Sequence, residues 1–356
     1  METNKESHMK NFENLQVSTP LELNNLTVKN RIVRSATHSM LGNLDGTISS
    51  AELKMFDDLA SNEIGLIIAG QFFVSKDGIV APGSNELVDD NHVTHAKKIM
   101  EVVKPYGTKV IAQLNHAGAK AYTEDPYGPS AYNLEDGRIA REMTLEEIES
   151  VKNAFVRAAQ HAKDAGIEGV QLHGAHGYIL CHFLKPSINK RTDLYGGSSE
   201  NRFRIVREIV SGIKEACGNT YPVFIKLDSN DLEDPTTYTE DVKFMVKALK
   251  DLGIEAIEFS GSEFGMKKYS EHNYFLERAM ELKGDVDVKT LVVGGVRNFE
   301  DMEKVLETGA DLVSLSRPFI SEPDLITRLM NGQEKARCVS CGKCFEAGEK
   351  RCILNK

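Results

Sequence analysis

The chain has 356 residues, with 53 acidic and 43 basic side chains and a net charge of −10. The charges are spread without a basic cluster, which argues against a nucleic-acid or anionic membrane surface and indicates small-molecule partners. No apolar run approaches the roughly 18 residues of a membrane helix, and the N-terminus METNKESHMKN lacks the apolar core of a secretion signal. These patterns predict an ordered cytoplasmic protein that binds neither nucleic acid nor membrane.

Short apolar segments alternate with longer amphipathic stretches along the chain, a pattern typical of parallel strands joined by crossover helices. Eight segments are expected as strands, at residues 31–33, 65–69, 109–113, 169–172, 223–226, 256–259, 291–293 and 312–315. This alternation predicts an α/β fold, either a closed (β/α)8 TIM barrel or a doubly wound open sheet. The character of the loops favours the barrel.

Two segments outside these units have their own signals. Residues 21–29, with the Asn24-Asn25 turn, predict an N-terminal hairpin that plugs the barrel floor. The polar stretch 118–142 has no strong period and is expected to be a functional loop over the barrel mouth. The expected organisation is a flexible extension, the barrel and a short cysteine-bearing tail, at residues 1–18, 19–334 and 335–356.

Helix starts are marked by capping residues. Thr144 and Glu147 have the spacing of a capping box ahead of an amphipathic run. Thr239 and Asn298 are expected to cap two later helices. These residues place helices and carry no chemistry.

Polar residues follow most of the predicted strands, where a barrel places its active site. Gly294-Gly295 and Ser316-Arg317 follow the last two strands, the usual phosphate site of barrels, where backbone N–H groups and an arginine bind the anion. A Gly-Gly pair alone is as often only a turn, but two coordinated loops strengthen the phosphate interpretation. The chain has no G-x-G-x-x-G after a strand and no Walker motif.

The stretch His173-Gly-Ala-His176-Gly-Tyr178 follows the fourth strand. Two imidazoles can donate hydrogen bonds to an oxygen that gains negative charge, and a phenol can supply a proton. The alternatives are a structural histidine pair and a metal pair, although no third ligand accompanies it.

Four of the six cysteines, Cys338, Cys341, Cys344 and Cys352, crowd the last twenty residues. Without a secretion signal, such clustering indicates metal or redox chemistry more than a disulfide framework. Closely spaced thiolates suit an iron–sulfur cluster or zinc. The alternative is a tail that packs without metal.

The chain resembles the old yellow enzyme or NADH:flavin oxidoreductase family from about residue 20 to residue 326. The resemblance rests on NRIVRSATHSM from Asn30, IAQLNHAGAK from Ile111, YGPSA from Tyr127, GVQLHGAHGYILCHFLKPSINKRTDLYGGSSENR ending at Arg202, VFIKLD around Lys226, VVGGVRNFEDME and GADLVSLSRPFISEPDL. So many motifs in one order make the resemblance specific. It implies an FMN-binding TIM barrel.

The resemblance also implies roles for single residues. The flavin ring would be lined by Ser35, Ala36, Thr37, His38 and Gln71. Gln113 would bind the pyrimidine edge of the flavin, and Lys226 would stabilise negative charge near N1 and O2. The phosphate would be held by Gly294, Gly295, Ser316 and Arg317. His173 and His176 would bind the substrate's carbonyl or nitro oxygen, and Tyr178 would protonate its α-carbon.

Two features depart from the simplest members. His38 stands where many bacterial relatives have cysteine or threonine, and the 2,4-dienoyl-CoA reductase branch shares this histidine. That branch, with trimethylamine dehydrogenase, has a similar cysteine tail that binds a [4Fe–4S] cluster, with a longer gap before the fourth cysteine. Ser316 replaces a more usual glycine.

The resemblance predicts an FMN-dependent oxidoreductase that uses NAD(P)H to reduce an electron-poor alkene or nitro compound, and a homo-oligomer. An alternative is an iron–sulfur flavoprotein that takes electrons from a partner protein. From other classes, the chain could be a flavin-free barrel with Lys226 as a Schiff-base amine or a non-catalytic redox-responsive binding protein.

Overall fold

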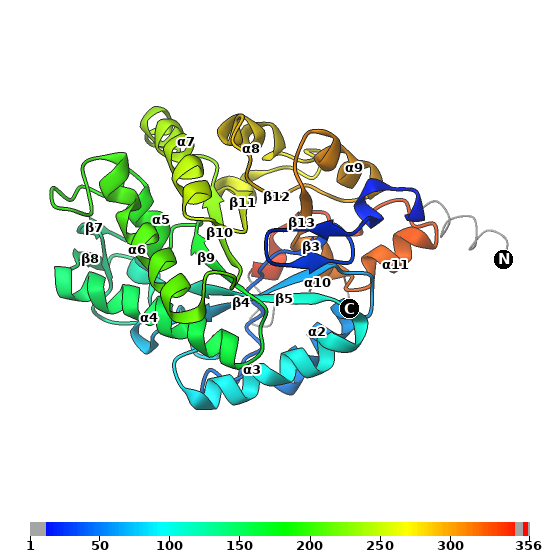
Figure 1. The fold of residues 1–356 in the computed structure, drawn as a ribbon, viewed down its shortest axis with the longest axis horizontal. Coiled ribbons are helices and arrows are strands. Elements are labelled where there is room, and N and C mark those ends of the chain that lie inside the picture. Colours follow the sequence, from blue (N-terminus) through cyan, green and yellow to red (C-terminus); the bar gives the residue numbers. More distant parts are fainter. Residues whose placement is uncertain (1–11, 135, 346–351, 355–356) are drawn as a thin grey trace.

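The computed structural model describes residues 12–134, 136–345 and 352–354. Eight parallel strands close into a barrel in the order β10-β11-β12-β13-β3-β4-β5-β9 (Figure 1). Their bounds are β3 (Ile32–Arg34), β4 (Leu66–Phe73), β5 (Lys109–Asn115), β9 (Val170–Gly174), β10 (Val223–Asp228), β11 (Ala256–Ser260), β12 (Thr290–Val293) and β13 (Leu312–Leu315). Because β13 pairs with β3, the sheet has no open edge. The predicted TIM barrel is therefore confirmed, and the alternative of a doubly wound open sheet is excluded.

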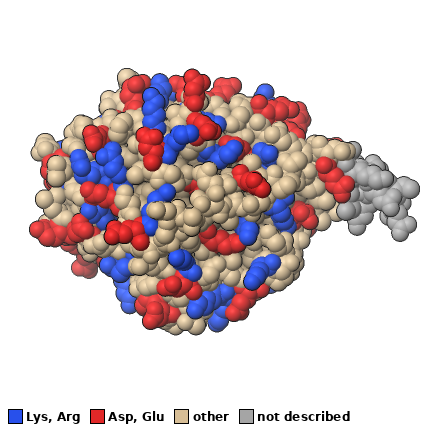
Figure 2. Space-filling model, viewed as in Figure 1, with Lys and Arg blue, Asp and Glu red and all other residues tan. Residues whose placement is uncertain are grey.

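Helices surround the barrel and bury their apolar faces against it (Figure 1). Their bounds are α2 (Ser50–Ala60), α3 (Asp90–Val103), α4 (Leu145–Asp164), α5 (Ile179–Leu184), α6 (Ser199–Cys217), α7 (Pro235–Asp251), α8 (Leu276–Lys283), α9 (Phe299–Glu307), α10 (Arg317–Ser321) and α11 (Leu325–Met330). Within the described residues, no helix combines the length and apolar character needed to cross a membrane. Figure 2 shows acidic and basic side chains interspersed on one face of the molecule.

The predicted hairpin is present as β1 (Leu21–Glu22) and β2 (Thr27–Val28), which pair antiparallel. Leu23, Leu26 and Val28 are buried in one cluster with barrel-strand residues such as Leu66 and Phe224. Apolar contact with the inner side of the strands therefore fixes the hairpin on the barrel.

Of the predicted extension, residues 1–11 lie outside the described residues. Phe12 and Val17 are buried, and the Glu303 carboxylate of α9 accepts hydrogen bonds from the backbone N–H groups of Gln16 (2.9 Å) and Val17 (2.8 Å). Residues 12–18 are thus packed on the barrel, and the division of the chain into extension, barrel and tail stays a prediction.

Two of the three predicted helix caps are confirmed. Thr144 and Glu147 form a reciprocal capping box at α4, and Asn298 accepts from the N–H of Asp301 at α9. The Thr239 prediction is wrong, because α7 begins at Pro235 and its cap is Asp234, five residues before Thr239. Proline fits the first helical turn, where its missing N–H costs nothing, so the Asp234-Pro235 pair determines the start.

The stretch 118–142 is more ordered than its polar sequence predicts. It contains a 3-10 turn, η4 (Gly118–Lys120), and a small sheet of β6 (Tyr127–Gly128), β7 (Tyr132–Asn133) and β8 (Ile139–Glu142). Buried His116 anchors this region, because its Nδ1 accepts from the Gly118 N–H, leaving Nε2 to donate to the Tyr127 hydroxyl at 3.0 Å. Of the described residues of this stretch, Lys120 alone lines the cavity described next.

Candidate active site

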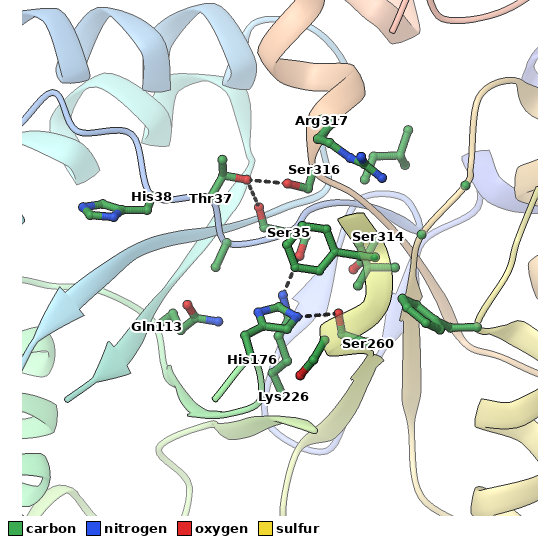
Figure 3. A pocket seen from close by; sticks show the side chains of 18 of the residues that line it. Ser35, Thr37, His38, Gln113, His176, Lys226, Ser260, Ser314, Ser316 and Arg317 are labelled. Atoms are coloured by element: carbon green, nitrogen blue, oxygen red, sulfur yellow. Dashed lines mark hydrogen bonds between the residues drawn. The ribbon is translucent and has the colours of Figure 1, made fainter. Parts of the chain in front are cut away.

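A cavity of about 610 Å³ opens at the carboxyl ends of the barrel strands, a size within the range of cofactor pockets. Figure 3 shows Ser316 and Arg317 on one side of it and His176 and Lys226 on the other. Every residue predicted to contact flavin or substrate lines it: Ser35, Ala36, Thr37, His38, Gln71, Gln113, His173, His176, Tyr178, Lys226, Gly294, Gly295, Ser316 and Arg317. The fold therefore brings together side chains that are almost 300 positions apart in the sequence.

A buried polar network in the cavity connects side chains of four strands, β5, β9, β10 and β11, with Ser35, which follows β3. Lys226 donates to the Ser35 hydroxyl (2.8 Å), which itself donates to Glu258 (2.7 Å). Lys226 also pairs with the Glu258 carboxylate at 3.3 Å. Glu258 accepts from Gln171 (2.8 Å), whose side-chain oxygen accepts from Gln113 (2.8 Å). Each side chain is thereby held by a neighbour on another strand, so the ammonium group of Lys226 is fixed toward the cavity.

His173 is the last residue but one of β9, and His176 follows in the next loop. The centroids of the two rings are 5.2 Å apart. Burial lowers the pKa of His176 to about 4 and that of His173 well below its ordinary value. Both imidazoles are therefore neutral at pH 7, so each carries one N–H. Nε2 of His176 lies 2.8 Å from the Ser260 hydroxyl, and Nδ1 of His173 has no hydrogen-bond partner among the described residues.

Asp228 fixes the backbone of His176, which has a left-handed φ of +62°. The carboxylate accepts from the His176 N–H at 3.1 and 3.2 Å, from the Ser262 hydroxyl at 2.5 Å, and pairs with Lys185 at 3.1 Å. Burial alone would raise the pKa of Asp228, but Lys185 and the other donors hold it below its ordinary value. An ionised carboxylate thus holds a backbone conformation that a non-glycine residue rarely adopts.

Tyr178 lies at the N-terminus of α5, with its ring centroid 5.0 Å from that of His173. Its hydroxyl oxygen accepts from the Gln71 amide at 3.1 Å, and Gln71 in turn accepts from Asn115 at 2.6 Å. Burial raises the pKa of Tyr178, so the phenol is protonated at neutral pH. Since the oxygen is occupied as an acceptor, its proton is available to a molecule in the cavity.

The opposite end of the cavity is rich in donors without partners. Ser314 Oγ, Arg297 Nε and Arg317 Nη1 are buried and make no hydrogen bond to any described residue. All three residues line the cavity. Burying hydrogen-bond donors costs free energy unless a ligand accepts hydrogen bonds from them. An anion such as the FMN phosphate has the acceptor oxygens to do so.

The glycine pair before Arg297 is required by close packing. Gly294 and Gly295 have φ values of +132° and +81°. A Cβ atom on Gly294 would lie 2.5 Å from the Tyr274 ring, and one on Gly295 would lie 2.6 Å from the Asn273 backbone nitrogen. The Tyr274 hydroxyl accepts from Arg317 at 2.9 Å, so this packing also orients the arginine.

His38 also lines the cavity, with its ring centroid 6.1 Å from that of Phe73. Thr37 links two strand ends, because its hydroxyl lies 2.8 Å from that of Ser316. Thr37 and His38 both line the cavity, and the influence of His38 on a flavin stays a prediction.

The site also contains residues that the sequence motifs do not single out. Arg297, two positions after the glycine pair, was visible at the end of the seventh strand but was not selected. Gln171 and Glu258 are polar residues inside apolar strand segments, a signal of a buried network. Asp228 ends β10 and Ser340 lies in the cysteine tail, but neither position indicates the residue's role, because their partners come from distant segments.

The four tail cysteines are free thiols that line one small cavity, which Arg317 also lines. Burial raises the pKa of the Cys338 thiol. Nevertheless, over residues 12–134, 136–345 and 352–354 no three His, Cys, Asp or Glu side chains are placed to hold a metal ion. The described part of the tail thus gathers the four thiols without a metal ligand set, and the predicted metal site stays a prediction.

Comparison with known proteins places this geometry in a family. A model of the NADH:flavin oxidoreductase / NADH oxidase family matches residues 16–336. The chain is 32% identical over 355 residues to NADH oxidase from Thermoanaerobacter brockii, covering 94% of this chain and 54% of that protein. It is 32% identical over 324 residues to NADPH dehydrogenase from Bacillus licheniformis, covering 88% of this chain and 93% of that protein.

A solved structure of 2-naphthoyl-CoA reductase in complex with 2-naphthoyl-CoA superposes with a TM-score of 0.83 at 26% identity, covering 90% of this chain and 53% of that one. The chain thus spans about half the length of the NADH oxidase and of the 2-naphthoyl-CoA reductase, and most of the length of the NADPH dehydrogenase. The family match covers the barrel and every residue around its cavity except Ser340. The chain belongs to the NADH:flavin oxidoreductase / NADH oxidase family, the family of the old yellow enzymes.

Proposed function

We propose that this chain is an FMN-dependent oxidoreductase that uses NAD(P)H to reduce electron-poor C=C bonds, such as those of enoates and enones, with nitro compounds as further acceptors. Family membership supports FMN and NAD(P)H. The observation that carries the proposal is the position of the Tyr178 phenol beside two neutral histidines in a cavity that also holds Lys226.

The residues present fit FMN at both ends of the cavity. Lys226 and Gln113 would contact the flavin ring, and the ring would also be lined by Ser35, Ala36, Thr37, His38 and Gln71. Arg297 and Arg317 would bind the phosphate, with Gly294, Gly295 and Ser316 beside them. When bound, FMN accepts hydride from NAD(P)H and passes hydride to the β-carbon of the alkene.

The chain's own residues complete the reduction. The N–H groups of His173 and His176 would bind the substrate oxygen, which gains negative charge as the β-carbon accepts hydride. Tyr178 would transfer its proton to the α-carbon, so that one hydride and one proton together saturate the double bond. The Gln71 amide donates to the Tyr178 oxygen and would stabilise the phenolate that forms.

The test is Tyr178→Phe, measured by anaerobic stopped-flow absorbance of the flavin. We expect alkene reduction to slow by roughly 10²–10⁴-fold, the usual contribution of a general acid. Flavin reduction by NAD(P)H should keep its rate, because it needs no proton from Tyr178. Tyr132→Phe, whose hydroxyl contacts His182, is the matched control and should leave both rates unchanged. Equal slowing of both half-reactions by Tyr178→Phe would refute the assignment.

The Schiff-base alternative is disfavoured by the surroundings of Lys226. Its ammonium group pairs with the buried Glu258 carboxylate, whereas a Schiff base needs a neutral amine. Purified protein that is colourless and does not take up FMN would nonetheless overturn the flavin proposal. Trapping of a carbonyl substrate on Lys226 by borohydride would then support the alternative.

A second candidate is an iron–sulfur flavoprotein that receives electrons from a partner protein. It is favoured by the gathering of Cys338, Cys341, Cys344 and Cys352 around one cavity beside Arg317. The similar 2-naphthoyl-CoA reductase adds an aromatic acyl-CoA to the substrates worth testing. Anaerobic iron and sulfide analysis decides between an enzyme with FMN alone and an iron–sulfur flavoprotein. Substoichiometric iron and sulfide, together with no zinc, would show that the tail binds no metal.

A cytoplasmic location and a homo-oligomeric state remain predictions from the sequence.

A further inference from the structure

The C-terminal segment 336–340 lies against the phosphate end of the cavity through contacts with Arg297. The Ala336 N–H donates to the Arg297 carbonyl at 2.8 Å. The Cys338 carbonyl and the Ser340 hydroxyl accept from the Arg297 guanidinium, each at 3.2 Å. Ser340 itself lines the main cavity. The tail thus holds a side chain that faces the cofactor pocket.

Arg297 is a buried cation with neutral hydrogen-bond partners. It is 1% exposed, and its guanidinium lies 4.4 Å from the ring centroid of Tyr269. Within the described ranges, no carboxylate forms an ion pair with it. The nearby Asp301 accepts from the Arg297 backbone N–H and pairs with His272. A buried charge without a counter-charge is expensive, so Arg297 is matched to an anion in the cavity.

We propose that the C-terminal segment is part of the flavin site, and that Ser340 and the Cys338 carbonyl position Arg297 for the FMN phosphate. This inference rests on the proposed FMN-dependent function. The guanidinium has five N–H donors in a rigid plane, and the segment uses two of its nitrogens while Nε stays without a partner. Holding the plane in one orientation aims the remaining donors at the anion.

Ser340 can be replaced by glycine with little disturbance of the backbone, because its φ of +56° lies in the left-handed region. Glycine adopts this conformation without strain, so Ser340→Gly removes the hydroxyl and preserves the backbone. Asparagine also tolerates it and retains a polar acceptor, so Ser340→Asn is the conservative variant. Val339→Ala is the matched control, because Val339 is 43% exposed and does not line the flavin cavity.

The experiment titrates the full-length chain, freed of flavin, with FMN and with riboflavin, and follows flavin fluorescence. Riboflavin lacks the phosphate and therefore reports on the ring end alone. Arg297→Met should weaken FMN binding roughly 10- to 100-fold, as expected for lost hydrogen bonds to a charged group. Ser340→Gly should weaken it about 3- to 10-fold, within the range of one hydrogen bond, and Ser340→Asn should recover part of this loss. Neither Arg297→Met nor Ser340→Gly should change riboflavin binding.

The double variant Arg297→Met/Ser340→Gly distinguishes positioning from a separate contact. If Ser340 acts through Arg297, the double variant binds FMN no more weakly than Arg297→Met alone. Additive losses, or equal losses for FMN and riboflavin, would overturn the inference. Unchanged FMN binding in Ser340→Gly would also overturn it while leaving the proposed function intact. Wild-type chain that binds neither flavin would instead refute the proposed function.

Discussion

The two ends of the cavity satisfy their polar groups in different ways. At the end formed by β9, β10 and β11, Lys226 and Glu258 neutralise each other within a network borne by barrel strands. At the other end, Arg297 and Arg317 retain buried donors without partners, and the C-terminal segment orients Arg297. The first end is organised by the barrel alone, whereas the second requires an anionic ligand and a segment beyond the barrel. Stability and cofactor affinity should therefore respond differently to substitutions at the two ends.

The largest expected effect is the loss of stability in Lys226→Met. This substitution leaves the Glu258 carboxylate, which is fully buried, without its cation. Breaking a buried pair in this way costs about 3–5 kcal/mol in unfolding free energy. Urea denaturation of the flavin-free chain measures this cost.

The matched control is Lys226→Met/Glu258→Gln, which removes both charges and keeps an acceptor for Ser35 and Gln171. Most of the lost stability should return in the double variant, because no charge is left unpaired. An equally unstable double variant would show that packing, not charge pairing, organises this end of the cavity.

Lowering the pH should cause a smaller loss of unfolding free energy. This loss should come from the buried histidines, which lie toward the end of the cavity formed by β9, β10 and β11. Burial lowers the pKa of His182 to about 3 and that of His176 to about 4, from 6.5. In the unfolded chain each would bind a proton below pH 6.5, whereas in the folded chain it stays neutral. Stability is therefore fully present above pH 6.5 and is lost as pH falls toward the folded pKa. One such histidine costs about 2 kcal/mol at pH 5, at 1.36 kcal/mol per pH unit.

Comparing the wild type with His182→Asn isolates one of these protons. Asparagine retains a polar group for the Tyr132 hydroxyl, which contacts Nδ1 of His182 at 3.1 Å. The slope of unfolding free energy against pH between 6.5 and 5 should be shallower in the variant, by about 1.4 kcal/mol per pH unit. Parallel slopes would mean that His182 takes up its proton in the folded state as well.

The sequence predicts the fold well because its signals are local and repeat. All eight barrel strands lie where apolar runs alternate with helices, and each predicted segment overlaps an observed strand. The exceptions are places where a competing local signal is stronger or where order comes from distant contacts. Pro235 starts α7 ahead of Thr239, and His116 organises the stretch 118–142 through Tyr127.

Site residues can be predicted from the sequence where a motif stands at the end of a strand. They cannot be predicted where a residue serves only to position another residue from a distant segment. His173 and Lys226 lie near the ends of β9 and β10. Tyr178 and Arg317 follow β9 and β13, so all four could be selected from the sequence. Asp228 also ends a strand, but its role depends on Lys185 and Ser262, which come from other segments. Ser340 lies between Cys338 and Cys341 in a motif that indicates metal or redox chemistry, so only its contact with Arg297 reveals its position in the site.

The smallest expected effect sharpens the contrast between the two ends. Asp228→Asn keeps an acceptor for the His176 N–H but removes the charge that holds the left-handed backbone at φ +62°. The affinity for a phenolic ligand such as 4-hydroxybenzaldehyde, followed by flavin absorbance, should fall about tenfold, or about 1.4 kcal/mol. FMN affinity should not change, because the phosphate donors lie at the other end. Ser262→Ala, which removes one donor to Asp228 and leaves its charge, should have a smaller effect. If Asp228→Asn weakened FMN and the phenol equally, the two ends of the cavity would be one cooperative unit and not two.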